Sequence, residues 1–416
     1  MWDAAGRDLG ADWLSRSNTD ASGLAGRRTR ADRPDRTRFG LPVAGVHRQG
    51  GGHSRKRCHG TQHHGPVVSQ MNSVERVQAA VELREPDRVP VDLHNFLPAA
   101  RATGMPFSEV FRDGETLAEA MLLAWREFGH DMILLENGTG CNAEACGAHV
   151  TYRDDGAPVA DEPILKRLED VSNLRVPDPE KAFPMREILR ATRILADEIG
   201  DRAWIVARAD QGPFDLASQL VGIENLMIAI AMGESDLVNG LLEFCRQVTA
   251  RYALALVEAG GRSTSIGEPL SGPGLISPAD YRRYAWVHQK RLADDLRERG
   301  LILANHVCGD TIPIIEDFVA TGAQILEIDH RTDMVRAKDA ARHRACLLGP
   351  IDTTLLATGT PTEVEEACRA AIEIMAPDSG FILGPGCAMG PETPLDNIHA
   401  LVEAAARYGR YPVSAR

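Results

Sequence analysis

Residues 301–310 read LILANHVCGD, a short apolar run that ends in a histidine and a cysteine before the pair Gly309-Asp310. A run of this length and composition, closed by a turn signal, predicts a buried β-strand. His306 and Cys308 are two residues apart, so their side chains project to the same side of that strand. Imidazole and thiolate are the ligand types that a zinc ion prefers.

A second short apolar run, residues 381–387, reads FILGPGC and also ends in a cysteine. If the two strand ends lie side by side, His306, Cys308 and Cys387 supply three soft ligands and leave one coordination position open. That arrangement is typical of a catalytic zinc site rather than a structural one. The competing interpretation is that these are ordinary buried residues, because cysteine is among the most buried residue types and His-x-Cys is a short pattern.

The rest of the chain repeats the same alternation of strand and helix. Short apolar runs predict strands at residues 89–93, 131–135, 203–209, 262–267, 301–306, 324–329, 345–351 and 381–384. Eight strands, each followed by at least one helical stretch, are the count of a (β/α)8 TIM barrel. A doubly wound open sheet is the competitor. It would normally carry a glycine-rich turn after its first strand if it bound a dinucleotide, and residues 92–96, DLHNF, form no such turn.

Several helix starts can be predicted from capping residues. Segments beginning at Ser277, Thr360 and Thr393 each place a hydroxyl at the N-cap, a proline at N1 and an acid at N3. Ser73 is the predicted N-cap of a helix that covers residues 76–81, close to the start of the barrel domain.

The predicted barrel gathers polar residues at the C-terminal ends of its strands, where the active site of this fold lies. Besides the histidine and the two cysteines, these ends carry several acids and a further histidine. The candidates for lining a substrate pocket are His94, Glu136, Asp210 and Glu268. Each of them is equally compatible with a structural role at a strand end.

Composition places the chain among ordinary globular proteins. Hydrophobic residues make up 44% of the 416 residues and charged residues 25%. No apolar stretch is long enough to span a bilayer and no secretory signal is recognisable, so we expect no membrane partner. The eight cysteines are scattered over a long chain, which favours reduced thiols and a cytoplasmic location.

Charge divides the chain into two parts. Residues 1–70 are rich in Arg, Gly and His and carry a net positive charge, whereas the remainder is acidic and gives the whole chain its formal charge of −13. Residues 1–70 cannot bury enough apolar surface to offset their ordering entropy, so they are predicted to be a disordered basic extension. The barrel is predicted over residues 71–416, and its acidic character argues against nucleic acid as a partner.

From about Met71 to the end, the sequence resembles the uroporphyrinogen decarboxylase superfamily, a family of barrels. The stretches that carry the resemblance are ERV (75–77), DRVP (87–90), GPFDLA (212–217), ISP (276–278), HVCGD (306–310), and GC through PETPLDNI (386–398). Together they cover nearly all of the predicted domain. The resemblance implies the barrel fold independently of the strand count.

Two branches of this superfamily differ in their signatures. True uroporphyrinogen decarboxylases carry Arg-Gln-Ala-Gly-Arg after the first strand and Phe-Ser-Asp after the second. Here the corresponding stretches read DLHNFLP (92–98) and LENG (135–138), so both signatures are missing. A tetrapyrrole with many carboxylates needs a cationic pocket, and these strand ends supply mostly acids. Porphyrin decarboxylation is therefore disfavoured.

The other branch contains corrinoid-dependent methyltransferases that act on coenzyme M and similar thiols. Their zinc motif, His-x-Cys followed much later by Cys, is matched by His306, Cys308 and Cys387. The resemblance implies an enzyme that moves a methyl group from a methylcorrinoid, held on a separate corrinoid carrier protein, to a small thiol activated as a zinc thiolate. Some members use an acid on the next strand as a further ligand. Asp329 occupies that place by spacing, although glutamate is the residue expected there.

Two alternatives stay open at this level. A metal-free decarboxylase of porphyrin or another acid predicts no zinc and activity that survives loss of Cys387. A non-catalytic barrel that binds a corrinoid or a tetrapyrrole predicts pigment binding without turnover. A homodimer also stays open.

Overall fold

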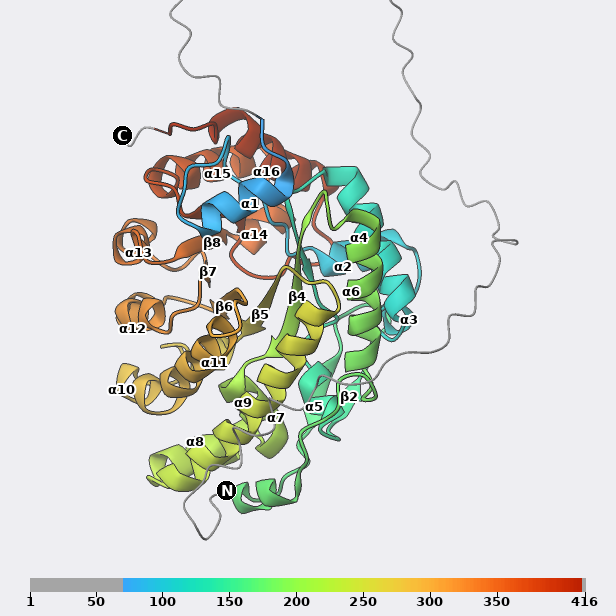
Figure 1. Ribbon diagram of the computed structural model, residues 1–416, viewed down its shortest axis with the longest axis vertical. Coiled ribbons are helices and arrows are strands. Elements are labelled where there is room, and N and C mark those ends of the chain that lie inside the picture. The colour runs from blue at the N-terminus through green and yellow to red at the C-terminus, as the bar shows by residue number, and fades with distance from the viewer. Residues whose placement is uncertain (1–69, 414–416) are drawn as a thin grey trace, which may run out of the picture. The chain divides into compact units, whose positions relative to one another are not determined.

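The computed structural model describes residues 70–413, so the predicted basic extension lies outside the described residues apart from its last position. The structure is an α/β barrel of the TIM type, as the sequence predicts (Figure 1). A parallel seven-stranded sheet has the order β1-β4-β5-β6-β7-β8-β9. The strands are β1 (Met132–Leu135), β2 (His149–Thr151), β3 (Val159–Glu162), β4 (Trp204–Gln211), β5 (Ser263–Gly267), β6 (Leu303–Val307), β7 (Ile325–Ile328), β8 (Cys346–Ile351) and β9 (Phe381–Pro385).

Most helices pack on the outside of the sheet (Figure 1). The helices are α1 (Ser73–Val81), α2 (Phe96–Ala102), α3 (Phe107–Val110), α4 (Gly114–Phe128), α5 (Cys141–Ala145), α6 (Met185–Ile199), α7 (Pro213–Val221), α8 (Ile223–Ala231), α9 (Ser235–Glu258), α10 (Pro278–Asp280), α11 (Val287–Arg297), α12 (Ile315–Ala320), α13 (Met334–Ala341), α14 (Thr353–Thr358), α15 (Pro361–Met375) and α16 (Leu395–Tyr408). The exception is α1, which precedes the strands and packs Val77, Ala80 and Val81 against the cluster inside the barrel. Within the described residues, no single helix is long and apolar enough to cross a membrane; α7 and α8 together reach that length and composition, but across a bend of 108°.

The sequence prediction of eight strands is confirmed for seven of them. The first predicted strand, residues 89–93, forms only isolated bridges, Val91 with Leu383 of β9 and Asp92 with Met132 of β1. Pro90 has no backbone N–H to donate, so this segment cannot complete a regular ladder. It nevertheless lies between β9 and β1, and its bridges to both edge strands close the sheet into a barrel. The antiparallel hairpin β2–β3 was not predicted.

Two of the predicted helix caps are confirmed and two are wrong. Ser277 and Thr360 accept hydrogen bonds from the backbone N–H groups of Asp280 and Glu363, as N-cap residues do. The Thr393 hydroxyl instead donates to the carbonyl of Gly390 and closes a turn ahead of α16. The cap of α1 is Asn72 rather than Ser73, because the Asn72 carboxamide reaches the N–H of Glu75 and Glu75 reaches back in a capping box.

Period-two alternation along the strands divides the core into two layers. One buried cluster lies inside the barrel and contains Met132, Leu134, Trp204, Val206, Ala304, Ile325, Cys346, Leu348 and Ile382. The side chains between these positions belong to the larger cluster between sheet and helices. The inside is therefore filled mostly with apolar side chains over the first part of the strands, and β5 contributes Ser263 and Ser265, of which Ser263 accepts a hydrogen bond from Trp204 Nε1. Polar residues follow on the same inward side, and these form the site described below.

An ion-pair network holds the N-terminal end of the barrel. The Asp131 network consists of Ser73, Arg76, Asp87, Arg88 and Asp131. Arg76 lies 2.6 Å from both Asp87 and Asp131, and Arg88 lies 2.7 Å from Asp131. Asp131 also accepts a hydrogen bond from the N–H of Val91 in the closing segment. The ERV and DRVP stretches are therefore structural, since they fasten α1 and the closing segment to the start of β1.

Candidate functional site

His306, Cys308 and Cys387 lie together at the C-terminal end of the barrel. His306 is the fourth residue of β6, Cys308 follows that strand directly, and Cys387 follows β9. Two strands separate β6 from β9 in the sheet, but their ends converge across the mouth of the closed barrel. His306 Nε2 is 3.0 Å from Cys308 Sγ, which is 3.9 Å from Cys387 Sγ. All three ligand atoms lie within 4.8 Å of one another, and we call these residues the His-Cys-Cys group.

The spacing of the His-Cys-Cys group fits a zinc ion. With Zn–N near 2.05 Å and Zn–S near 2.3 Å, a tetrahedral site needs N···S and S···S separations of roughly 3.6 and 3.8 Å. The S···S separation of 3.9 Å is within about 0.1 Å of that value, and the N···S separation of 3.0 Å is about 0.6 Å shorter than its value. His306 is buried, whereas both cysteines are half-buried. Three soft ligands with access from the mouth leave a coordination position for a substrate.

Electrostatics already favour a thiolate in this group. Hydrogen bonds from the Cys308 thiol and the His306 ring lower the pKa of Cys387 to about 4, and they outweigh burial, which by itself raises that pKa. The same contact with Cys387 raises the pKa of Cys308. The two shifts are opposite in direction, so the contact between the sulfurs favours a thiolate at Cys387 and a protonated thiol at Cys308. Thiolate is the form of cysteine that binds metals.

A chain of alternating charges leads from the His-Cys-Cys group into the barrel. Glu327, on β7, lies 3.7 Å from His306 and accepts a hydrogen bond of 3.0 Å from His94 Nδ1. His94 lies 3.4 Å from Glu136, which in turn pairs with Arg208 at 2.9 Å. We call His94, Glu136, Arg208 and Glu327 the ion-pair chain. Its members are all buried, and each charge has an opposite neighbour, as buried charges require.

The ion-pair chain shifts the titration of its members. Burial opposes the ionisation of Glu327, but the charges of His306 and His94 outweigh it and hold the pKa of Glu327 at about 2. Burial also disfavours charge on His94, but Glu136 and Glu327 raise its pKa well above the ordinary value. Glu327 is therefore an anion and His94 a cation at neutral pH. Strongly perturbed groups of this kind mark functional sites.

The structure separates the four residues that the sequence placed in the pocket. His94 and Glu136 lie in the ion-pair chain, and Asp210 lies at the end of β4 beside it. Glu268 lies elsewhere: its carboxylate accepts hydrogen bonds from the N–H groups of Phe214 and Asp215 and caps α7. Glu268 is also tied to the strand ends through its own N–H, which donates to the carbonyl of His306.

Asp329 contacts backbone rather than the His-Cys-Cys group. Its carboxylate accepts hydrogen bonds from the N–H of Gly309, at 2.8 Å, and of Arg331, at 3.0 Å. It thereby fixes the turn that follows Cys308. The acid of β7 that lies beside His306 is Glu327, two residues earlier on the same strand. Asp329 as a metal ligand stays a prediction.

Sequence reasoning missed Glu327 and Arg208. Both lie inside strands, whereas the sequence predictions concern residues at strand ends. Alternation could have found them. On β4, Trp204 and Val206 face the inside of the barrel, so Arg208 comes next on that side, and on β7 Ile325 precedes Glu327 in the same way.

Several buried polar atoms around the ion-pair chain have no hydrogen-bond partner among the described residues. These include both carboxylate oxygens of Asp92, Arg208 Nη1 and Asp210 Oδ1. Burial raises the pKa of Asp92 and of Asp210 to about 7 in each case. Unpaired buried polar atoms are rare in folded proteins and require an explanation. A ligand that pairs with them would supply one.

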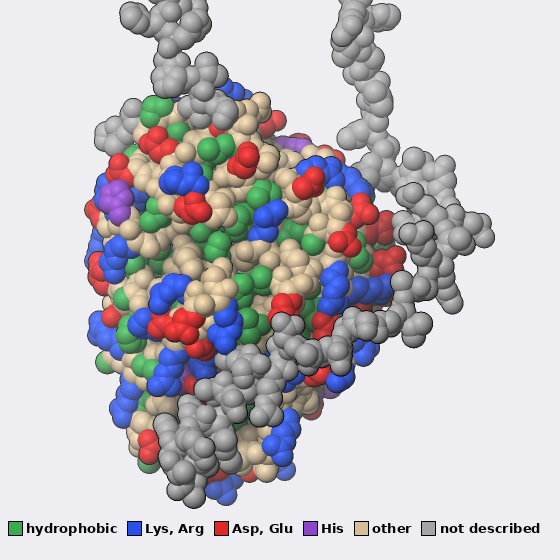
Figure 2. Space-filling model, in the orientation of Figure 1, with side chains coloured by type: hydrophobic (Ala, Val, Ile, Leu, Met, Phe, Trp, Pro, Cys, Tyr) green, Lys and Arg blue, Asp and Glu red, His purple; other side chains and the backbone are tan. Residues whose placement is uncertain are grey.

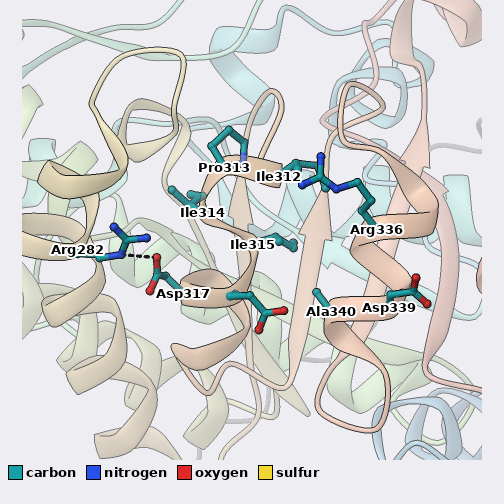
Figure 3. Close-up of a pocket in the computed structure, with 10 residues that line it drawn as sticks. Arg282, Ile312, Pro313, Ile314, Ile315, Asp317, Arg336, Asp339 and Ala340 are labelled. Carbon is teal, nitrogen blue, oxygen red and sulfur yellow. Dashed lines mark hydrogen bonds and ion pairs between the residues drawn. The ribbon is translucent and has the colours of Figure 1, made fainter.

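A surface groove elsewhere on the barrel does not have the chemistry of this site (Figure 3). It has a volume of about 510 Å³ and is lined by the Ile312–Asp317 segment, Arg282 and parts of α13. Arg282 points toward Asp317 and pairs with it at 2.7 Å. The lining contains no imidazole or thiol.

On the face drawn in Figure 2, acidic and basic side chains of the described residues are interspersed rather than gathered by sign.

Comparisons with known proteins match almost the whole described barrel. The family model described as "Uroporphyrinogen decarboxylase (URO-D)" matches residues 72–408. The methylcobamide:CoM methyltransferase MtbA of Methanosarcina acetivorans is 27% identical over 351 residues, which are 82% of this chain and 99% of that protein. A uroporphyrinogen decarboxylase of Thermus thermophilus is 31% identical over 300 residues, covering 71% of this chain and 85% of that protein.

A solved structure supports the fold. The "methyltransferase from Methanosarcina mazei" superposes with a TM-score of 0.75 at 24% identity, covering 81% of this chain and 99% of that chain. At that level of identity the likeness concerns the fold alone. The barrel predicted from the sequence is thus found in the structure and in a solved relative.

Proposed function

The chain belongs to the uroporphyrinogen decarboxylase family, and we propose that it is a zinc-dependent methyltransferase that moves a methyl group from a methylcorrinoid to a small thiol. The observation that carries the proposal is the convergence of His306, Cys308 and Cys387 at the barrel mouth, with separations that suit zinc. The likeness to methylcobamide:CoM methyltransferases over most of the chain supports the reaction class.

The residues of the site have separate tasks in this proposal. A zinc ion held by the His-Cys-Cys group supplies a Lewis acid that keeps the acceptor thiol in its nucleophilic thiolate form at neutral pH. Glu327 orients His306 through its backbone carbonyl, which lies 3.2 Å from His306 Nδ1, and its carboxylate adds a negative charge 3.7 Å from the same nitrogen. Asp329 holds the backbone after Cys308 and so positions that sulfur. The half-buried sulfurs leave the open side of the group facing the mouth.

The methyl donor reaches the site from outside the barrel. The matched residues 72–408 form the barrel itself, whose inside is filled mostly by apolar side chains below the site. We therefore propose that the methylcorrinoid is carried by a separate protein that docks at the mouth. The methyl group passes from cobalt to the thiolate sulfur, with the electron pair of the new S–C bond supplied by sulfur and that of the Co–C bond left on the corrinoid.

The competing decarboxylase reaction has less support at the site. A substrate with many carboxylates needs several unpaired cations. In the ion-pair chain, His94 lies between Glu136 and Glu327, and Arg208 uses its Nε for Glu136. One edge of one guanidinium is left unpaired, which is fewer cations than such a substrate needs. A metal-free decarboxylase also gives no reason for the sulfurs of Cys308 and Cys387 to lie at a spacing that suits a zinc ion.

Zinc analysis of the full chain tests the proposal. We expect about one zinc per chain in the wild type and none in Cys308→Ser or Cys387→Ser. Cys146→Ser is the matched control, because Cys146 is also half-buried but lies outside the His-Cys-Cys group. The wild type should then demethylate free methylcobalamin in the presence of a thiol, followed by absorbance. A folded wild type that binds no zinc, or variants that keep it, would contradict the proposal.

A further inference from the structure

Two buried polar atoms at the end of β4 lack hydrogen-bond partners and are candidates for binding the polar groups of a substrate. Arg208 and Asp210 lie two residues apart at the end of β4, and both side chains are buried. Arg208 Nη1 and Asp210 Oδ1 each have no hydrogen-bond partner among the described residues. One is a cationic donor and the other an acidic acceptor. Burial makes an unpaired charge costly, so a bound group with complementary charges is a natural partner for this pair.

Asp210 is held in place at an energetic cost. Its φ of 60° lies in the left-handed region, which a residue with a side chain rarely adopts. Asn142 keeps it there: its N–H donates to Asp210 Oδ2 at 2.7 Å, and its carboxamide donates to the carbonyls of Ala209 and Gln211 on either side. One carboxylate oxygen is thus anchored and the other is left free. Strain that the surroundings maintain in this way is typical of functional positions.

Arg208 lies close to the His-Cys-Cys group. Its guanidinium passes over Gly267, where an added Cβ would stand only 2.1 Å from Nη2. Gly267 pairs with His306 in the register of β5 and β6, so the guanidinium lies at the level of the metal-binding histidine. The Nε of Arg208 is used by Glu136, at 2.9 Å, which leaves the far edge of the fork for another acid. A glycine at position 267 provides the space that this arrangement needs.

We propose that the acceptor is an amino-acid thiol, whose carboxylate pairs with Arg208 and whose ammonium group pairs with Asp210 while its sulfur lies on the His-Cys-Cys group. This inference rests on the proposed function and narrows its substrate class. A purely structural Arg208–Glu136 pair accounts for neither the free Nη1 nor the strained and anchored Asp210. A thiol that carries an acid alone leaves Asp210 unpaired, and a thiol that carries an amine alone leaves Arg208 unpaired. Either mismatch is penalised by the desolvation of the unpaired group.

Matched thiols test the substrate class on the zinc-loaded full chain by calorimetry. Each of two sets holds an amino-acid thiol, an analogue with the acid alone and an analogue with the amine alone, all with the same number of carbons between sulfur and the charged group. The shorter set is L-cysteine, 3-mercaptopropionate and cysteamine. The longer set is L-homocysteine, 4-mercaptobutyrate and 3-aminopropanethiol. In at least one set, the amino-acid thiol should bind roughly 10- to 100-fold more tightly than both partial analogues, because each lost charged hydrogen bond weakens binding by about that factor. This comparison needs no variant.

Two variants assign the contacts. Asp210→Asn should remove the preference for the ammonium group but keep that for the acid, and Arg208→Gln should do the reverse. Arg282→Gln, in the surface groove, is the control and should change neither preference. If an acid-only or amine-only thiol binds as tightly as the amino-acid thiols, the inference is wrong although zinc-dependent thiol binding stands. If no thiol binds the zinc-loaded protein, the proposed function falls with it.

Discussion

The two ends of the barrel use the same residue types in opposite ways. At the N-terminal end, Asp131 accepts hydrogen bonds from Ser73, Arg76, Arg88 and the N–H of Val91, so its two oxygens are fully used. At the C-terminal end, Asp92 and Asp210 are equally buried, yet three of their four oxygens have no partner among the described residues.

The contrast separates stability from function. A buried charge whose hydrogen bonds are all made within the chain holds elements together and has nothing left to offer a ligand. A buried polar atom without a partner lowers stability, and it persists where a ligand completes it. We call the N-terminal end, where the buried charges have all their hydrogen bonds, the fastening end or saturated end of the barrel. We call the C-terminal end, where buried polar atoms lack partners, the working end. The predictions that follow test that distinction, and the largest effect belongs to the saturated end.

Breaking the saturated end should destabilise the protein without affecting the proposed metal site. Asp131→Asn leaves the half-buried charge of Arg88 without a counterion and removes one of the two carboxylates that pair with the buried Arg76. We expect the free energy of unfolding to fall by about 3 to 5 kcal/mol. Urea unfolding measures the loss, and zinc content in the absence of urea should stay at the wild-type value. A loss below about 1 kcal/mol would show that the network is not what fastens this end.

His130 is an exception at the fastening end and should make stability depend on pH. Both of its ring nitrogens are buried without a partner, and burial lowers its pKa to about 4. The unfolded chain takes up this proton near pH 6.5, whereas the folded protein does so only near pH 4. Stability should thus fall by up to about 3 kcal/mol as pH drops from 6.5 to 4.

The measurement for His130 is urea unfolding at several pH values. His130→Leu should flatten the dependence in this window relative to the wild type. His399→Gln, which changes a surface histidine on α16, should leave the dependence unchanged. An identical slope in wild type and His130→Leu would mean that other groups carry the acid sensitivity.

Changing the working end should affect the metal more than the fold. Glu327→Gln removes the negative charge beside His306 and His94 but keeps the shape of the side chain. Outer carboxylates of metal-binding histidines typically contribute 10- to 100-fold in affinity. The variant keeps the hydrogen bond between His306 Nδ1 and the backbone carbonyl of residue 327 and loses only the charge, so zinc affinity should fall by about 10-fold, the lower end of that range. Competition with a chelator measures it, with Glu316→Gln on the exposed side of α12 as the control. Unchanged affinity would separate Glu327 from the metal site.

The smallest effect is expected at the cap of α1. Asn72→Ala removes the side-chain acceptor for the N–H of Glu75 and half of the capping box. The expected loss is about 1 kcal/mol, which should appear as a lowered melting temperature with unchanged zinc content. A change in zinc content here would contradict the independence of the two ends.

Much of the fold could be predicted because it depends on local composition. Seven strands were recognisable as short apolar runs, and the caps at Ser277 and Thr360 as hydroxyl, proline and acid in fixed order. The closing segment at residues 89–93 was overestimated, since an apolar run containing Pro90 can bridge two strands without forming a ladder.

Local sequence is enough to place His306 and Cys308 on one side of a strand and Cys387 after another, because period-two alternation is a property of the extended chain. The polar neighbours that these residues meet depend on how the barrel closes. Glu268 turned to cap α7 and Asp329 to hold the turn at Gly309, whereas Glu327 and Arg208, from inside their strands, came to the site. The reason is physical: a side chain's partner is set by closure of the barrel, which brings together strands far apart in the chain.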